Sequence, residues 1–323
     1  MIITKTPLRI SFFGGGTDFF DYFSKHGGAV LSTSINKYMY ITVNATFNDE
    51  IILKYSTTEK VRTVDEVQHP LIRECLKLVG IRSGVEITSM ADIPGATGLG
   101  SSSSFTVGLL NALHAFKKEY VSQSQLASEA IKIECNILKS TPGWQDQVAA
   151  AKGGFNLIEF GDGFQTTRVV CLDSVKKSVE ENCLLFFIGN VSDNKNLLVQ
   201  QNESVKNNLV PLAKMKDLAV SAFSSLCRNN IRSFGDWLKQ NWEYKKKLHE
   251  EISNPTIDQY ADLAMKKGAE GYKVCGAGGR GFLLVYAQRG HHSIITKTLW
   301  LKGLKPISFG FENEGSRVIL YEA

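Results

Sequence analysis

The stretch Asp92-Ile93-Pro94-Gly95-Ala96-Thr97-Gly98-Leu99-Gly100-Ser101-Ser102-Ser103-Ser104-Phe105 holds three glycines and four consecutive serines. Residues 84–89 before it alternate as a strand does, and apolar residues after it recur at helical spacing. We therefore expect a glycine-rich turn that leads into a helix. The first N–H groups of such a helix lack partners and the helix dipole adds positive charge, which predicts an anion site, usually for phosphate. The alternative is a loop with a serine cap.

A second glycine cluster follows the first expected strand, residues 2–13. Pro7 favours an edge or the start of that strand, which also carries Arg9. The segment Gly14-Gly15-Gly16-Thr17-Asp18 comes next, and its glycines permit a close approach of the backbone to a ligand. The cluster predicts a binding loop, although Asp18 can instead serve only as the cap of a helix over residues 19–25.

Two carboxylates stand out after the central stretch. Glu134 lies on a helix expected over residues 124–138, and Asp146 follows the turn Pro142-Gly143 at the start of a short helix. A carboxylate in the first turn of a helix faces partial positive charge, so we expect Asp146 to stay ionised. The alternatives are a solvated helix residue for Glu134 and a cap for Asp146.

The order of the expected elements predicts an α+β fold, since strands precede helices without regular βαβ alternation. A length of 323 residues favours two domains. The polar, asparagine-rich stretch 189–201 places the boundary, giving domains 1–190 and 191–323. The second domain contains a third glycine-rich turn, Gly276-Ala277-Gly278-Gly279-Arg280, between two short strands.

Composition restricts the function classes. The net charge of +5 is mild, and the only basic run, Lys245-Lys246-Lys247, is expected to be a solvated helix face, which argues against nucleic acid. The six cysteines show no metal-site spacing and are expected to be reduced. Neither a signal-peptide core nor a membrane-length apolar run occurs, which predicts a soluble, cytoplasmic protein without membrane contact.

The three glycine clusters, in the chain order 14–18, 94–103 and 276–279, resemble those of the GHMP family of small-molecule kinases. The resemblance spans nearly the whole chain. It implies the two-domain GHMP kinase fold, with a ribosomal protein S5 domain 2-like N-terminal domain and a ferredoxin-like C-terminal domain.

The resemblance also implies roles for residues of the site. Ser102 and Glu134 would help hold Mg²⁺. Asp146 would orient or deprotonate the acceptor hydroxyl, and Arg9 would lower the pKa of that carboxyl and offset charge on the transferred phosphoryl group. The phosphates of ATP would be wrapped by Pro94, Gly95, Ala96, Thr97, Gly98, Leu99, Gly100, Ser101, Ser102 and Ser103.

The remaining residues would face the acceptor. The resemblance implies contacts to it from Gly15, Gly16, Thr17, Asp18, Gly276, Gly278, Gly279 and Arg280. Arg280 stands where the family is expected to have a small residue, so it is either an added phosphate contact or a solvated loop residue.

The segment Thr6-Pro7-Leu8-Arg9-Ile10-Ser11-Phe12-Phe13-Gly14-Gly15-Gly16-Thr17-Asp18 is most similar to the sugar-phosphate branch of the family, and so is Gly143-Trp144-Gln145-Asp146-Gln147. That branch implies ATP-dependent phosphorylation of a small sugar phosphate, D-glycero-D-manno-heptose 7-phosphate, at its anomeric C1 hydroxyl. The alternatives are a kinase for another sugar of the galactose or fucose type or for an isoprenoid-precursor alcohol, and a non-catalytic nucleotide-binding relative. The sequence leaves the oligomeric state open.

Overall fold

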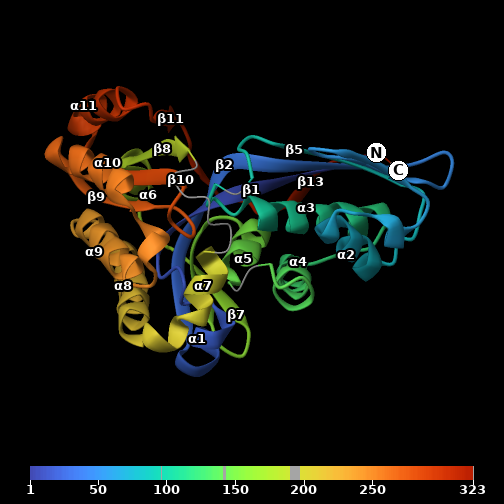
Figure 1. The fold of residues 1–323 in the computed structure, drawn as a ribbon, viewed down its shortest axis with the longest axis horizontal. Helices are drawn as coiled ribbons and strands as arrows, with labels where there is room; N and C mark the ends of the chain where they lie inside the picture. Colours follow the sequence, from blue (N-terminus) through green and yellow to red (C-terminus); the bar gives the residue numbers. More distant parts are fainter. Residues whose placement is uncertain (96, 141–142, 190–196, 323) are drawn as a thin grey trace.

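The computed structural model describes residues 1–95, 97–140, 143–189 and 197–322. The strands within these ranges form two sheets, one of nine strands and one of four. The sheets lie toward opposite ends of an elongated molecule, with helices packed against each (Figure 1). The termini lie side by side at the far end of the larger sheet, where the amino group of Met1 donates a hydrogen bond to the carbonyl of Glu322.

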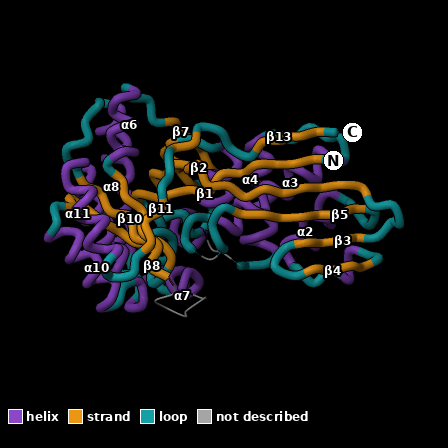
Figure 2. The backbone as a smooth tube through the Cα atoms, turned by 90° about the horizontal axis from the view of Figure 1, so that it is seen from above, coloured by secondary structure: helices purple, strands orange, loops and turns teal. Residues whose placement is uncertain are grey.

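The larger sheet carries the long β-branched and aromatic segments of the chain. Its path runs β13-β1-β2-β5-β3-β4 (Figure 2). Off this path, β6 and β12 pair with β2, and β7 pairs with β6. The pairs are antiparallel except β3 with β5. Its strands are β1 (Ile2–Phe13), β2 (Gly28–Ala45), β3 (Ile51–Lys54), β4 (Thr58–Val61), β5 (Val85–Ala91), β6 (Phe155–Phe160), β7 (Phe164–Arg168), β12 (Phe311–Glu312) and β13 (Arg317–Tyr321).

Strand β2 is continuous over its 18 residues and bulges where it passes Pro7. Pro7 pairs with Tyr38 and Leu8 with Ile35, so β2 carries two extra residues, Asn36 and Lys37, at this point. A proline has no N–H to give to a ladder, and a bulge tolerates it. The pairing of β13 with β1 ends at Lys5, just before the proline.

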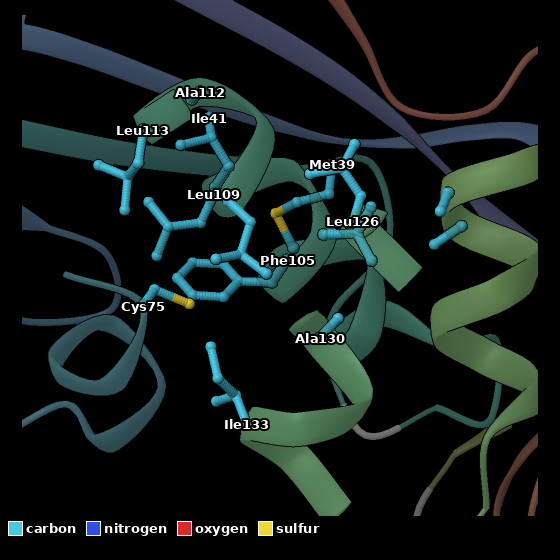
Figure 3. Close-up of a cluster of buried hydrophobic side chains, with 14 of the residues drawn as sticks. Met39, Ile41, Cys75, Phe105, Leu109, Ala112, Leu113, Leu126, Ala130 and Ile133 are labelled. Carbon is cyan, nitrogen blue, oxygen red and sulfur yellow. The ribbon is translucent and has the colours of Figure 1, made fainter. Parts of the chain in front are cut away.

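Five helices complete the part of the chain that packs on this sheet: α1 (Phe20–His26), α2 (Pro70–Val79), α3 (Ser101–Phe116), α4 (Gln123–Ile131) and α5 (Gln145–Lys152). Helix α3 contacts β1 and β2 on one side and α2, α4 and α5 on the other, so it is buried on all sides rather than along one stripe. Phe105 and Leu109 of α3 pack against Met39, Cys75 and Leu126 from neighbouring elements (Figure 3). This core fixes the start of α3 relative to the sheet.

The smaller sheet has the order β11-β8-β10-β9, with every pair antiparallel. Its strands are β8 (Cys183–Gly189), β9 (Ala269–Val274), β10 (Gly281–Ala287) and β11 (Lys305–Ile307). The accompanying helices are α6 (Asp173–Glu181), α7 (Leu197–Glu203), α8 (Leu209–Cys227), α9 (Phe234–Lys246), α10 (Pro255–Lys266) and α11 (Arg289–Trp300). Helices α8 and α9 also contact β1, which joins the two parts.

The two sheets divide the chain differently from the expected boundary at residue 190. β8 precedes that boundary but pairs with β10 and β11, while β12 and β13 follow it and pair with β2 and β1. The expected boundary was chosen from the polar composition of one stretch. The pairing of strands depends instead on apolar residues that lie far apart in the sequence. Each sheet is therefore built from both sides of residue 190.

Candidate active site

A pocket lies between the larger sheet and the turn that joins β9 to β10, and all three glycine-rich segments reach it. The fold thus gathers residues that are far apart in the chain. The expected site residues that line it are Arg9, Gly15, Gly16, Asp18, Gly98, Gly100, Ser101, Ser102, Ser103, Glu134, Asp146, Gly276, Gly278 and Arg280.

The start of α3 forms one wall of the pocket. Gly98 and Gly100 both have positive φ, 83° and 77°, and Gly100 is the left-handed residue before the helix. No side chain of the described residues caps the helix, so its first N–H groups have no side-chain acceptor there. Glycine is needed here because side chains rarely adopt this conformation. The wall has the properties of an anion site.

The outer part of the central stretch lies away from the pocket. Thr97 is buried, and its hydroxyl donates to the carbonyl of Pro94 at 3.0 Å, while Pro94 and Gly95 are exposed. Leu99 is fully buried in the hydrophobic core. Ala96 lies outside the described residues.

Arg9 and Asp146 form a bidentate ion pair at the floor of the pocket. Nε and Nη2 of Arg9 donate to Oδ1 and Oδ2 of Asp146 at 2.7 and 2.8 Å. Nη1 of Arg9 donates to the carbonyl of Gly98 at 2.6 Å, which ties the pair to the loop before α3. Asp146 lies in the first turn of α5, as expected, and its side chain is 26% exposed. The carboxylate is thus fixed in orientation and still reachable from the pocket.

Glu134 is a second carboxylate of the pocket, and its surroundings differ. The expected helix over residues 124–138 ends as α4, and Glu134 lies on the π-helical turn Lys132–Ile137 that follows. Such turns are frequent at functional sites. The residue is 1% exposed, and burial raises the pKa of its carboxyl. The alternative that Glu134 is a solvated helix residue is therefore wrong.

The partners of Glu134 are all neutral. Its oxygens accept hydrogen bonds from Ser103 at 2.7 Å, Thr106 at 2.8 Å, Ser102 at 3.2 Å, and the amide of Gln147. No Lys or Arg among the described residues pairs with it. Ser102 is the exposed serine of the group, whereas Ser103 is buried. A buried carboxylate without a cation, beside an exposed hydroxyl, is a donor set that suits Mg²⁺.

Asp18 also lines the pocket and is 1% exposed. Its Oδ1 accepts from the N–H of Gly16 at 2.8 Å, and Oδ2 accepts from the N–H of Gln145 at 3.3 Å. Burial raises the pKa of Asp18, and these hydrogen bonds and nearby Lys245 offset part of that rise. Thr17 does not line the pocket: its hydroxyl donates to the carbonyls of Gly14 and Ala29 and so holds the loop.

Two lysines that line the pocket are not among the site residues predicted from the sequence. Lys245, in α9, is 4% exposed, so it is not part of the solvated face expected for the run of three lysines. Lys273, in β9, is equally buried and donates to the carbonyls of Ser11 and Phe12. Burial lowers the pKa of Lys245 to about 8 and that of Lys273 to about 7.

The third glycine-rich turn, residues 276–280, packs on the glycine-rich loop before α3. A Cβ on Gly276 would lie 2.5 Å from Cα of Gly98, and one on Gly281 would lie 2.1 Å from the carbonyl oxygen of Thr97. The two backbones therefore touch, so this turn holds the loop before α3 as well as lining the pocket. Gly279 donates to the carbonyl of Ile252 and does not line the pocket, while Arg280 does line it.

Two family descriptions match the chain: the GHMP kinases N terminal domain over residues 66–154 and the GHMP kinases C terminal domain over residues 222–292. The chain belongs to the GHMP kinases. GHMP kinases use ATP as their phosphate donor, and the chain is a kinase of this family, as the sequence predicts.

Individual GHMP kinases are similar along much of the chain. D-glycero-alpha-D-manno-heptose 7-phosphate kinase of Campylobacter jejuni is 26% identical over 97% of both chains. L-fucokinase/L-fucose-1-P guanylyltransferase of Bacteroides fragilis is 26% identical over 88% of this chain, which spans 34% of that longer protein.

A crystal structure of a D-glycero-D-manno-heptose 1-phosphate kinase from Bacteroides thetaiotaomicron superposes with a TM-score of 0.84 at 23% identity, covering both chains fully. This likeness establishes the two-domain GHMP kinase fold with mixed α and β content. No helix in the described part of this GHMP kinase is long and apolar enough to cross a membrane.

Proposed function

We propose that this GHMP kinase transfers the γ-phosphoryl group of ATP to the anomeric C1 hydroxyl of D-glycero-D-manno-heptose 7-phosphate, giving the 1,7-bisphosphate. The observation that carries the proposal is the Arg9–Asp146 pair at 2.7 and 2.8 Å, reachable from a pocket whose wall is the uncapped start of α3. The similarity to a heptose 7-phosphate kinase over 97% of both chains supports the choice of acceptor.

Asp146 has the position of the residue that orients and deprotonates the acceptor hydroxyl. Its ion pair with Arg9 fixes the orientation of the carboxylate, and the first turn of α5 places partial positive charge beside it. The Arg9 guanidinium also places positive charge beside the transferred group, where negative charge must be stabilised. Positioning and charge neutralisation are the main demands of phosphoryl transfer.

The N–H groups at the start of α3 bind the phosphates of ATP in this proposal. The backbone contact between the first and third glycine-rich turns keeps that wall in place, since Gly276 and Gly98 leave no room for a side chain. The cytoplasmic location and the absence of nucleic-acid and membrane partners predicted from the sequence remain part of the proposal.

Mg²⁺ fits the uncompensated carboxylate of Glu134, with Ser102 as the accessible hydroxyl beside it at 3.2 Å. When bound, the ion would neutralise phosphate charge. Ser103 and Thr106 orient the carboxylate, and Gln147 fixes its far oxygen.

A panel of acceptors tests the proposal. The protein is incubated with ATP, Mg²⁺ and heptose 7-phosphate, L-fucose, D-galactose or mevalonate, and ADP release is followed by a coupled assay. We expect the highest kcat/KM with heptose 7-phosphate, and ³¹P NMR of the product should show a phosphate on C1. Turnover of a free hexose without turnover of heptose 7-phosphate would reject this acceptor, while phosphorylation at another carbon would reject the position.

A further inference from the structure

The three consecutive glycines of the second cluster are required for different reasons. A Cβ on Gly14 would lie 1.9 Å from the carbonyl oxygen of Ala29, and Gly16 has a φ of +108°. Gly15 has neither constraint, because its φ is not positive and its nearest neighbours would be Ser11 Oγ at 3.5 Å and Gln145 Nε2 at 3.7 Å. Both are ordinary van der Waals distances, so the backbone does not need glycine at position 15.

What Gly15 provides is open space in a polar part of the pocket. Gly15, Ser11, Gln145 and Lys245 all line the pocket, and we call them the Gly15 corner. Nζ of Lys245 lies 3.4 Å from the carbonyl oxygen of Gly15. The notional Cβ of Gly15 points between Ser11 and Gln145, so any side chain there would fill the space between them.

The corner contains polar atoms without partners. Ser11 is 4% exposed, and its hydroxyl has no hydrogen-bond partner among the described residues; the same holds for the buried Oε1 of Gln145. An unpaired buried polar atom costs free energy, and native proteins rarely keep two side by side unless a ligand or water completes them. The corner therefore has the character of a binding subsite.

The chemistry of these atoms restricts the ligand. Oε1 of Gln145 only accepts, the Lys245 ammonium only donates, and the Ser11 hydroxyl does either. A hydroxyl group satisfies all three, since it donates and accepts, whereas a phosphate dianion cannot donate to Gln145. The backbone N–H of Gln145 also donates to Asp18, which places the corner beside the carboxylate expected to contact the acceptor.

We propose that the Gly15 corner binds non-reacting hydroxyl groups of the acceptor and so selects a polyhydroxylated sugar over an alcohol without such neighbouring hydroxyls. This inference rests on the proposed function and assigns the corner to the acceptor rather than to ATP. Ser11, Gln145 and Lys245 then determine specificity, and Gly15 supplies the room.

Gly15→Ala and Gln145→Met test the corner, with Gly161→Ala as the matched control because a Cβ there meets nothing within 4 Å. Steady-state kinetics should show KM for the sugar raised about tenfold in both corner variants. KM for ATP should be unchanged, and the control should match the wild type. A deoxy sugar that lacks the bound hydroxyl should lose about tenfold in kcat/KM with the wild type but little more with Gln145→Met.

Unchanged KM for the sugar in both corner variants would overturn the inference and leave the proposed function standing. A wild-type protein that phosphorylates mevalonate but none of the sugars would overturn both. If Gly15→Ala does not fold, the deoxy-sugar comparison with Gln145→Met decides, since that side-chain change keeps the N–H that holds Asp18.

Discussion

Two carboxylates line the same pocket and are held in opposite ways. Asp146 pairs with the guanidinium of Arg9 through two hydrogen bonds of 2.7 and 2.8 Å. Within the described ranges, Glu134 accepts hydrogen bonds only from neutral groups, the hydroxyls of Ser102, Ser103 and Thr106 and the amide of Gln147. Asp146 is 26% exposed at its side chain, whereas Glu134 is 1% exposed.

The difference indicates where each negative charge finds its counterion. The protein itself supplies a permanent cation to Asp146, so that carboxylate has its counterion before any ligand binds. It supplies none to Glu134, whose buried charge is costly until a cation arrives. We infer that Asp146 acts on the acceptor and that Glu134 acts on a metal ion.

The largest effect should come from removing the charge of Asp146. Asp146→Asn keeps the size of the side chain but removes the base, so kcat should fall by about 10² or more. Steady-state ADP release measures the loss. Binding of an ATP analogue to the variant serves as the control, because the start of α3 is untouched.

Turnover that stays within a few-fold of the wild type would contradict the role of Asp146 as a base. If ATP-analogue binding also disappears, the ion pair with Arg9 has a structural role in the loop before α3, which Arg9 reaches through the carbonyl of Gly98.

A smaller effect is expected for Glu134→Gln, and it should appear in the metal dependence. The amide fits the same space, and the hydroxyls of Ser102 and Thr106 can turn to accept from it. Without the carboxylate, the Mg²⁺ concentration for half-maximal activity should rise about ten- to a hundredfold. Titration of activity with Mg²⁺ measures this, and an unchanged midpoint would exclude Glu134 as a metal-binding residue.

The same variant, Glu134→Gln, should not destabilise the protein when metal is absent. Burial raises the pKa of Glu134 in the folded protein, so its contribution to stability is present below the unfolded pKa and is lost as pH rises through the folded pKa. In EDTA at neutral pH, Glu134→Gln should therefore unfold at the same temperature as the wild type or higher. A lower Tm would show that the charged form is favoured without metal.

The resemblance to the GHMP kinases, carried by the glycine clusters, implied that both carboxylates belong to the site, and both line the same pocket. Their different surroundings were not predictable, because they depend on the π-helical turn that turns Glu134 inward and on Ser103, Thr106 and Gln147 meeting there. Lys245 was missed for a similar reason: in a run of three lysines only the fold decides which one faces inward.

The fold, too, was only partly predictable from the sequence. Helix α2 spans Pro70–Val79 because two local signals bound it: proline starts the helix and Gly80 in the left-handed conformation ends it. The partners of β8, β12 and β13 could not be read from local patterns, since pairing of distant strands depends on complementary faces formed only in the folded chain. Local chemistry predicts elements better than it predicts their neighbours.

The smallest expected effect concerns a carboxylate whose counterion titrates. His114, near the end of α3, places Nε2 2.8 Å from Glu129 and Nδ1 3.1 Å from Glu119. The hydrogen bond with Glu129 is the main reason that the pKa of His114 is raised. The stability that this pair adds is therefore present below the unfolded pKa of about 6.5 and is lost as pH rises through the folded pKa.

His114→Gln should consequently lower the free energy of unfolding by about 1 kcal/mol at pH 6 and by less at pH 8.5. Urea unfolding at the two pH values measures the difference. His69→Asn is the matched control, because burial lowers the pKa of His69 and its side chain caps α2, a role that asparagine retains. Its effect should have the opposite pH dependence. If His114→Gln lowers the free energy of unfolding equally at both pH values, the histidine stabilises the protein through packing and not through its charge. The comparison of counterions would then rest on Asp146 and Glu134 alone.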